Sequence, residues 1–199
     1  MFDNEIKRYR LLNELAGQGG TVIIGGAEDT EIPLCELKQA FALESDLYNR
    51  SAANLSISNA VEFYDSCAAA LHPESDYLHI GSADHEAFEQ APSAFDQKYR
   101  ELIRHIRNID KACEIAVISL KNPEKRPIIA EMNRHLRVIA QSEKCEFGDI
   151  AANRVWNPKE TRDVVSFIHS IGFIHPLRSK RPLYDMIKIL FCYEPAHIA

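Results

Sequence analysis

The segment Thr21-Val22-Ile23-Ile24-Gly25-Gly26 is the most informative stretch of this chain for its fold. A run of β-branched residues followed by two glycines is typical of a short strand that is buried on both faces and ends in a tight turn. Similar runs predict four further strands, within residues 46–50, 76–80, 115–118 and 145–150. Strands of this kind occur in parallel sheets whose two faces are covered by helices.

Helical periodicity fills the intervals between these runs. Apolar residues repeat at helical spacing within residues 6–15, 34–41, 57–71, 95–106, 129–139, 164–171 and 183–190. The alternation predicts an α/β fold, a three-layer α/β/α arrangement around a five-stranded parallel, flavodoxin-like sheet. No linker, low-complexity tract or internal repeat interrupts the pattern, so residues 1–199 are expected to form a single domain.

Charge and cysteine content exclude several classes of protein. The net charge is −6, from 23 Lys and Arg against 29 Asp and Glu, whereas a non-specific nucleic-acid binder needs a basic face. No apolar stretch approaches the length of a membrane span, and the first residues do not resemble a secretory signal. The five cysteines form no C-x-x-C pair and are expected to be buried free thiols. We therefore expect a cytoplasmic protein without nucleic-acid or membrane partners.

The loops that follow the strands are where a site is expected, because parallel sheets bind ligands outside the carboxyl ends of their strands. These loops begin near Gly25, Ser51, Gly81, Lys121 and Asn153, and a further segment around His175 precedes the last helix. Gly25-Gly26 lacks the spacing of a dinucleotide fingerprint or a P-loop. Asp84-His85 has no second cluster of ligands at metal-binding spacing. No cofactor and no metal are therefore expected.

Taken together, these loops resemble those of the SGNH (GDSL-type) hydrolases, a superfamily of esterases, lipases and acylhydrolases. The segments that match the family's blocks in order are 22–27 (Gly-Asp-Ser), 49–54 (second block), 79–84 (Gly-x-Asn-Asp) and 173–176 (Asp-x-x-His-Pro). A helix containing Asn133 is similar to the one before the family's fifth strand, and the resemblance covers roughly residues 20 to 192. It implies ester hydrolysis by a serine after the first strand, activated by the histidine of the last block.

The resemblance also implies which catalytic groups this chain has replaced. Ala27 stands at the serine position and Ala83 at the position of the oxyanion-hole asparagine. Asn54 stands at the glycine of the second block, and Gly172 at the aspartate that orients the histidine, so only His175 is kept. Loss of one oxyanion donor alone typically costs about 10² to 10³ in rate. A degenerate member without this chemistry is therefore the favoured interpretation.

Our first hypothesis is a non-catalytic protein that keeps the cleft as a binding or interaction surface. Its ligand would be a small molecule such as an acyl or carbohydrate ester, or else a partner peptide, and a homo-oligomer is left open. Exposed aromatic rings at Tyr48, Trp156 or Tyr184 would favour a carbohydrate. The residues expected to line the pocket are Gly26, Ala27, Glu28, Asp29, Asn54, Ser82, Ala83, Asp84 and His175.

The second hypothesis is an atypical esterase or acylhydrolase with a relocated constellation. Ser82, at a strand tip expected to face His175, is the main nucleophile candidate. Alternatively, His175 with Asp29 or Asp84 could activate water as a general base. The secondary nucleophile candidates are Thr30, Ser51 and Ser56.

A third hypothesis is a flavodoxin-like receiver or nucleotide-binding module. Glu28-Asp29 would supply the acidic pair of a receiver, Asp84 its phosphorylated residue and Lys121 its lysine. His175-Pro176 has no role in such a scheme, so this hypothesis ranks below the other two.

Overall fold

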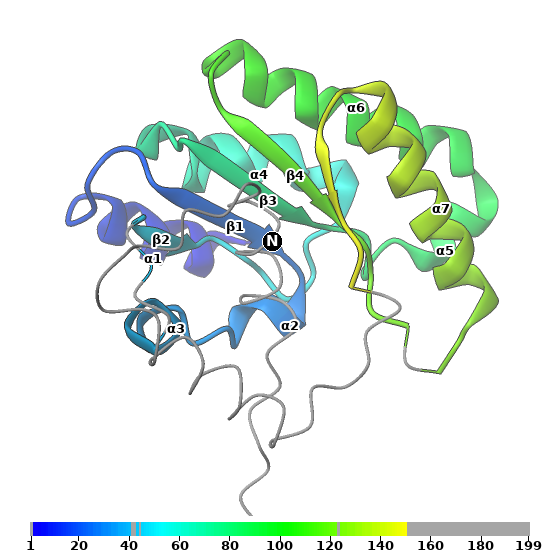
Figure 1. Cartoon of the computed structure of the whole chain (residues 1–199), viewed down its shortest axis with the longest axis horizontal. Helices are drawn as coiled ribbons and strands as arrows, with labels where there is room; N and C mark the ends of the chain where they lie inside the picture. The colour runs from blue at the N-terminus through cyan, green and yellow to red at the C-terminus, as the bar shows by residue number, and fades with distance from the viewer. Residues whose placement is uncertain (1, 41–42, 44, 123, 151–199) are drawn as a thin grey trace, which may run out of the picture.

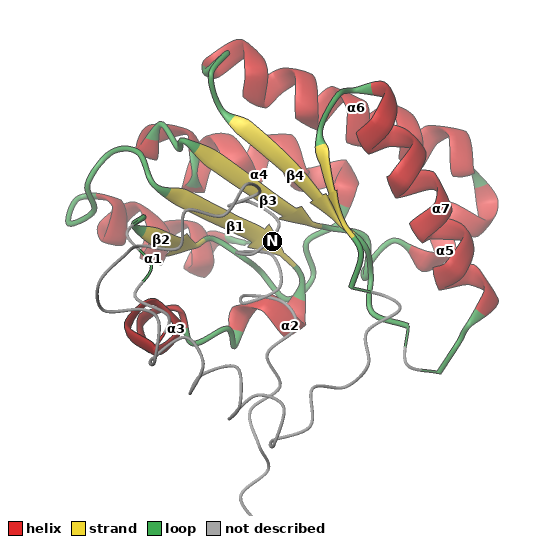
Figure 2. Cartoon of the chain, in the orientation of Figure 1, coloured by secondary structure: helices red, strands yellow, loops and turns green. Residues whose placement is uncertain are grey.

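A single parallel sheet forms the centre of the structure. The computed structural model describes residues 2–40, 43, 45–122 and 124–150, and its strands follow the order β2-β1-β3-β4-β5 (Figures 1 and 2). The strands are β1 (Thr21–Gly25), β2 (Leu47–Asn49), β3 (Ser75–His79), β4 (Glu114–Ile118) and β5 (Glu146–Gly148). Each overlaps one of the five predicted strands. The order is that of flavodoxin-like sheets, as predicted.

Helices flank both faces of this sheet. They are α1 (Asp3–Asn13), α2 (Ala27–Thr30), α3 (Leu34–Ala40), α4 (Ala60–Cys67), α5 (His85–Gln90), α6 (Pro92–Ile109) and α7 (Pro127–Ser142), with 3-10 helices at Ile57–Asn59 and Ala69–Leu71. The right-handed crossover from β1 to β2 puts α2 and α3 on one face. Later crossovers run the opposite way across the sheet and put α4, α6 and α7 on the other (Figure 1). The three-layer prediction is confirmed. The helices predicted at 164–171 and 183–190 lie outside the described residues.

The main core lies between the sheet and the helices α4, α6 and α7. The predicted apolar stripe of α6 is buried as expected, and the Tyr99 hydroxyl on this helix donates to the carbonyl of Leu78 at 3.2 Å. Full burial of a large apolar side chain contributes about 1.5–3 kcal/mol. Buried side chains on this face include Val22, Ile24, Leu78, Val117, Phe63, Leu102, Ile106, Met132 and Leu136.

Two predicted helices differ in detail from those observed, and two short ones were not predicted. α1 ends at Asn13, so Leu15 lies beyond the helix and is 86% exposed, while Tyr9 is the buried residue of the predicted face. The segment 57–71 is broken into a 3-10 helix, α4 and a second 3-10 helix, since α4 ends at Cys67 and the second 3-10 helix begins at Ala69. α2 and α5 span too few residues to show a helical period.

Two further expectations were that the cysteines are buried free thiols and that the chain has no membrane-spanning helix. Cys67 and Cys113 are buried as expected, but Cys35 is exposed because it lies on the outer side of the short helix α3. The cysteines in the described ranges form no disulfide. Within those ranges, no helix combines the length and the apolar character that crossing a bilayer requires.

Asp76 is an ionisable residue inside the core face of β3. Its side chain is fully buried, and its Oδ2 accepts hydrogen bonds from the Tyr64 hydroxyl at 2.9 Å and the Cys113 thiol at 3.4 Å. Among the described residues, its Oδ1 has no hydrogen-bond partner. Burial raises the pKa of Asp76 from 3.8 to about 7, an effect that these two hydrogen bonds oppose.

We expect Asp76→Asn to change how stability depends on pH. The folded protein keeps a proton on Asp76 that the unfolded chain releases above pH 3.8, so the free energy of unfolding falls as pH rises toward 7. Between about pH 5 and pH 7 the free energy of unfolding of the wild type should fall by about 2 kcal/mol, whereas that of the variant should not show this fall. Urea denaturation of both proteins at the two pH values measures this. A difference between them that is the same at both pH values would contradict the assignment.

Candidate functional site

A cavity of about 250 Å³ opens at the carboxyl ends of β1, β3 and β4. The chain leaves β1 toward β2 and returns to β3 on its other side, so strand order reverses between β1 and β3. Open α/β sheets bind ligands at such a reversal. The polar and charged side chains nearest the strand ends in its lining are Glu28, Asp29, His79, Ser82, His85 and Lys121.

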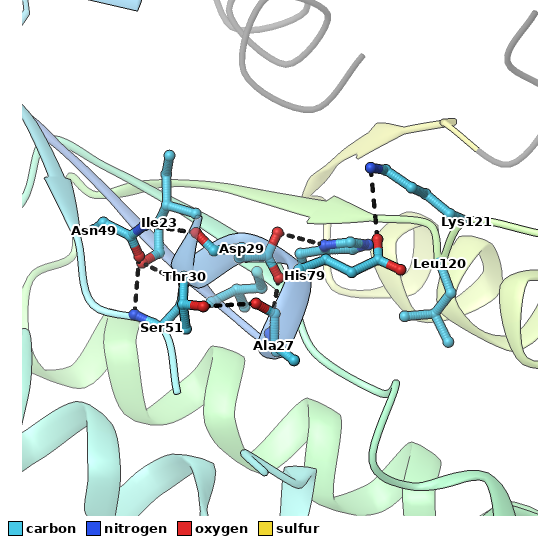
Figure 3. A network of polar contacts seen from close by, with 12 residues as sticks. Ile23, Ala27, Asp29, Thr30, Asn49, Ser51, His79, Leu120 and Lys121 are labelled. Carbon is cyan, nitrogen blue, oxygen red and sulfur yellow. Dashed lines mark hydrogen bonds and ion pairs between the residues drawn. The ribbon is translucent and has the colours of Figure 1, made fainter. Parts of the chain in front are cut away.

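Asp29 connects the ends of three strands. It is the third residue of α2, and its side chain turns back so that Oδ2 accepts the N–H of Gly26 at 2.8 Å. Its Oδ1 lies 2.8 Å from Nδ1 of His79, the last residue of β3 (Figure 3). The amide of Asn49, at the end of β2, donates to the Asp29 carbonyl at 2.6 Å. The side chains of Asp29 and His79 are both buried.

Gly25, the last residue of β1, and Gly26, which follows it, lie where these side chains approach the backbone closely. A Cβ at Gly25 would lie 2.0 Å from Oδ2 of Asp29, and a Cβ at Gly26 would lie 2.3 Å from Oγ of Ser82. The Asp29 carboxylate cannot retreat from Gly25 without breaking its contacts with His79 and the Gly26 N–H, whereas the exposed Ser82 hydroxyl can turn away from Gly26. The pair predicted as a simple turn therefore also brings Asp29 and Ser82 against the backbone.

The charge state of His79 follows from its pairing with Asp29. Burial alone would lower the pKa of His79, but the negative charge of Asp29 and its hydrogen bond outweigh burial and raise it. An imidazolium is tolerated in this buried position because it is paired and hydrogen-bonded. Sequence reasoning missed His79, which was assigned only to a strand. The register of β1 and β3, which aligns Gly25 with His79, brings it to Asp29.

Of the predicted ligand residues, Glu28, Asp29 and Ser82 line the cavity. The ones that do not line it are Gly26, Ala27, Asn54, Ala83 and Asp84. Asn54 and Ala83 are exposed. The buried carboxylate of Asp84 accepts the N–H of Ile57 at 3.0 and 3.2 Å and so anchors a 3-10 helix. His175, Trp156 and Tyr184 lie outside the described residues.

The other hydroxyls and Tyr48 have contacts of their own. The Thr30 hydroxyl donates to the Ala27 carbonyl at 2.7 Å, and the Ser51 hydroxyl reaches the Ile23 carbonyl at 3.5 Å (Figure 3). The Ser56 hydroxyl accepts from the Asn59 amide at 3.2 Å. The Tyr48 hydroxyl donates to the carbonyl of Gly17 at 3.1 Å, away from the cavity lining. Ser82 is thus the exposed hydroxyl among the residues that line the cavity.

The loop after β4 forms the opposite wall. Asn133 of α7 binds both backbone groups of Leu120, donating to its carbonyl at 2.8 Å and accepting its N–H at 2.7 Å. This is the asparagine that the family resemblance singled out on a helix, and it fixes the loop to α7. Next to Leu120, the Lys121 ammonium lies 3.5 Å from the carboxylate of Glu28 on α2.

His85 supplies a second imidazole to the cavity. It is the first residue of α5 and is half-buried. Burial and the positive charge of Arg126 lower the pKa of His85 below 6.5, which favours a neutral ring at pH 7. The described part of the chain contains no cluster of three or more His, Cys, Asp or Glu side chains suited to a metal ion.

We expect Asp29→Asn to reverse the pKa shift of His79. Without the carboxylate, burial dominates and the pKa of His79 should fall below 6.5, a change that NMR titration of the imidazole C2 proton measures. The wild-type pairing stabilises the fold below pH 6.5 and is lost as pH rises through the raised pKa, so the variant should be most destabilised in acid. Breaking a buried pair costs about 3–5 kcal/mol.

Asp65→Asn is a matched control, because Asp65 pairs with His105 at 2.6 Å with half of its side chain exposed. It should cost less than about 1 kcal/mol, as exposed pairs do. Equal losses of stability in the two variants would contradict a special role for Asp29.

Comparison with known proteins finds similar structures but no similar sequence. No family model matches the chain, and no curated protein matches it. A Streptococcus pneumonia protein provisionally named a platelet activating factor is 18% identical, with a TM-score of 0.62 and 74% of each chain covered. The acetylxylan esterase Axe2 from Geobacillus stearothermophilus is 14% identical, with a TM-score of 0.53 over 82% of this chain and 99% of its own.

TesA is also similar, at 11% identity and a TM-score of 0.51 over 84% of this chain and 88% of its own. A further neighbour is described as a GDSL-like lipase from Parabacteroides merdae, at 12% identity and a TM-score of 0.51. Identities this low bear on the fold alone. The chain has an SGNH/GDSL hydrolase-like fold, as the order of its loops predicted.

Proposed function

We propose that this chain is a ligand-binding protein that holds a small polar molecule, such as an acyl or carbohydrate ester, in the cavity and has lost ester hydrolysis from the end of β1. The observation that carries the proposal is the hydrogen bonding and side-chain content of the loop after β1. The Gly26 N–H is occupied by Asp29, and the next side chain is the methyl group of Ala27.

Ester hydrolysis through an acyl-enzyme needs a nucleophile and unoccupied donors aimed at the developing oxyanion. Ala27 carries no nucleophilic atom. The amide of the preceding residue, Gly26, already donates a charge-assisted hydrogen bond to Asp29. The Gly26 N–H and the Asp29 carboxylate therefore stabilise the loop itself, which supports binding over hydrolysis.

The cavity offers a ligand groups of several kinds. The Ser82 hydroxyl can donate and accept, and the Glu28–Lys121 pair presents one charge of each sign. A volume of about 250 Å³ is slightly below the usual range for small-molecule sites, which suits a small ligand or one end of a longer one. Because some structural neighbours are acetylxylan esterases, an acetylated xylobiose is a reasonable neutral probe.

The second candidate function is ester hydrolysis by a relocated nucleophile. The observation that favours it is that Ser82 lines the same cavity as the buried Asp29–His79 pair. A histidine held by an aspartate is the arrangement that orients a general base in serine hydrolases. The sequence-based version of this candidate uses His175 as the base, with Ser82 or an activated water.

We expect the initial rate of p-nitrophenyl acetate hydrolysis to be at background level and equal in the wild type, Ser82→Ala and His175→Ala. The assay includes Ser93→Ala as a matched control, because Ser93 is an exposed serine near the start of α6. A rate that falls in Ser82→Ala but not in Ser93→Ala would favour the second candidate over the first. A rate that falls only in His175→Ala would favour an activated water.

Binding is tested separately, by NMR titration of backbone amides with the acetylated xylobiose. We expect saturable shifts at Glu28, Ser82 and Lys121, because these residues line the cavity. Shifts confined to residues away from the cavity would contradict the proposed site.

A further inference from the structure

We infer that the ligand of this cavity carries an anionic group, a carboxylate or a phosphate, that binds between Arg126 and His85. This inference rests on the proposed binding function and names the chemical class of its ligand.

The first argument is the balance of charges in the cavity lining. Two of its carboxylates already have cationic partners, since Asp29 pairs with His79 at 2.8 Å and Glu28 lies 3.5 Å from Lys121. Among the described residues, Arg126 forms no ion pair. A guanidinium that lines a cavity without a carboxylate partner is suited to an oxyanion, which it can bind through two parallel hydrogen bonds.

The second argument is how the backbone fixes Arg126. The Asn122 side chain closes the turn before α7, accepting the Arg126 N–H at 2.7 Å and donating to its carbonyl at 3.0 Å. Arg126 is the residue immediately before α7, a helix of 16 residues with no acidic side chain in its first turn. The positive end of the helix dipole therefore adds to the charge of the guanidinium.

The third argument is that Arg126 opposes the protonation of His85, which lines the same cavity. The Arg126 charge disfavours the protonated form of His85, and Glu89 on α5 is the carboxylate that favours it. An anion between the two would accept hydrogen bonds from both and remove the repulsion. Glu124 also lines the cavity; Glu124 and Arg126 are both exposed, and they form no ion pair with each other in the described part of the chain.

The experiment is an NMR pH titration of the histidine C2 protons in the full chain, with acetate, inorganic phosphate or chloride at equal ionic strength. We expect acetate or phosphate, but not chloride, to raise the pKa of His85 by about 1, the effect of an opposite charge within about 4–6 Å. The anion that saturates at the lower concentration distinguishes a carboxylate from a phosphate ligand. Arg126→Gln should abolish the rise, and Glu124→Gln should strengthen binding.

Lys125→Gln is the matched control, because it also removes one positive charge. Lys125 is next to Arg126 in the sequence and is exposed, but it does not line the cavity. This substitution should leave the rise intact. An anion effect that persists in Arg126→Gln, or no effect with either anion, would overturn the inference. If neither anion changes the pKa of His85 but the acetylated xylobiose still shifts the cavity amides, the proposed binding function stands and only the anionic ligand is ruled out. If neither acts, both proposals fail.

Discussion

The carboxylate of Asp29 holds together the edge of the sheet at which the candidate site lies. It accepts the N–H of Gly26, pairs with His79 across the boundary between β1 and β3, and belongs to a residue whose carbonyl receives the amide of Asn49 from β2. A buried charge is stable only when it is paired and hydrogen-bonded, so each contact supports the others. The absence of a side chain at Gly25 follows from the same constraint.

These contacts also limit what the site can do chemically. In the hydrolases that the sequence resembles, the residue after β1 is the nucleophile, whereas here that residue is Ala27 and the preceding Gly26 N–H donates to Asp29. What faces the cavity instead is the Ser82 hydroxyl, a pair of opposite charges and an arginine without an ion-pair partner in the described structure. On the opposite wall, Asn133 and Asn122 fix the backbone at Leu120 and Arg126. A concave site with a few convergent polar and charged groups is the kind of place at which small molecules bind.

The fold was more accessible from the sequence than the site. Buried parallel strands such as β1 form continuous apolar runs, and handedness then determines which helices share a face. The Asp29–His79 pair was not accessible, since the two residues are 50 positions apart and meet only through the register of β1 and β3. Asp84 shows the converse, because its place in a polar loop suggested a ligand residue while its carboxylate is buried against the N–H of Ile57. Neither the direction in which the Asp84 side chain points nor its burial can be inferred from the residues next to it in the sequence.

The most direct test of this account is ¹⁵N NMR of the His79 imidazole in the unmodified protein, which reports the protonation of each ring nitrogen. If Asp29 holds this ring, Nδ1 stays protonated across the whole range in which exposed histidines titrate, because its proton is shared with the carboxylate. The full imidazolium should also persist above pH 6.5, in line with its raised pKa. An Nδ1 without a proton at neutral pH would contradict the pairing of Asp29 with His79. The position of Asp29 against the Gly26 N–H and the proposed binding cavity both depend on that pairing.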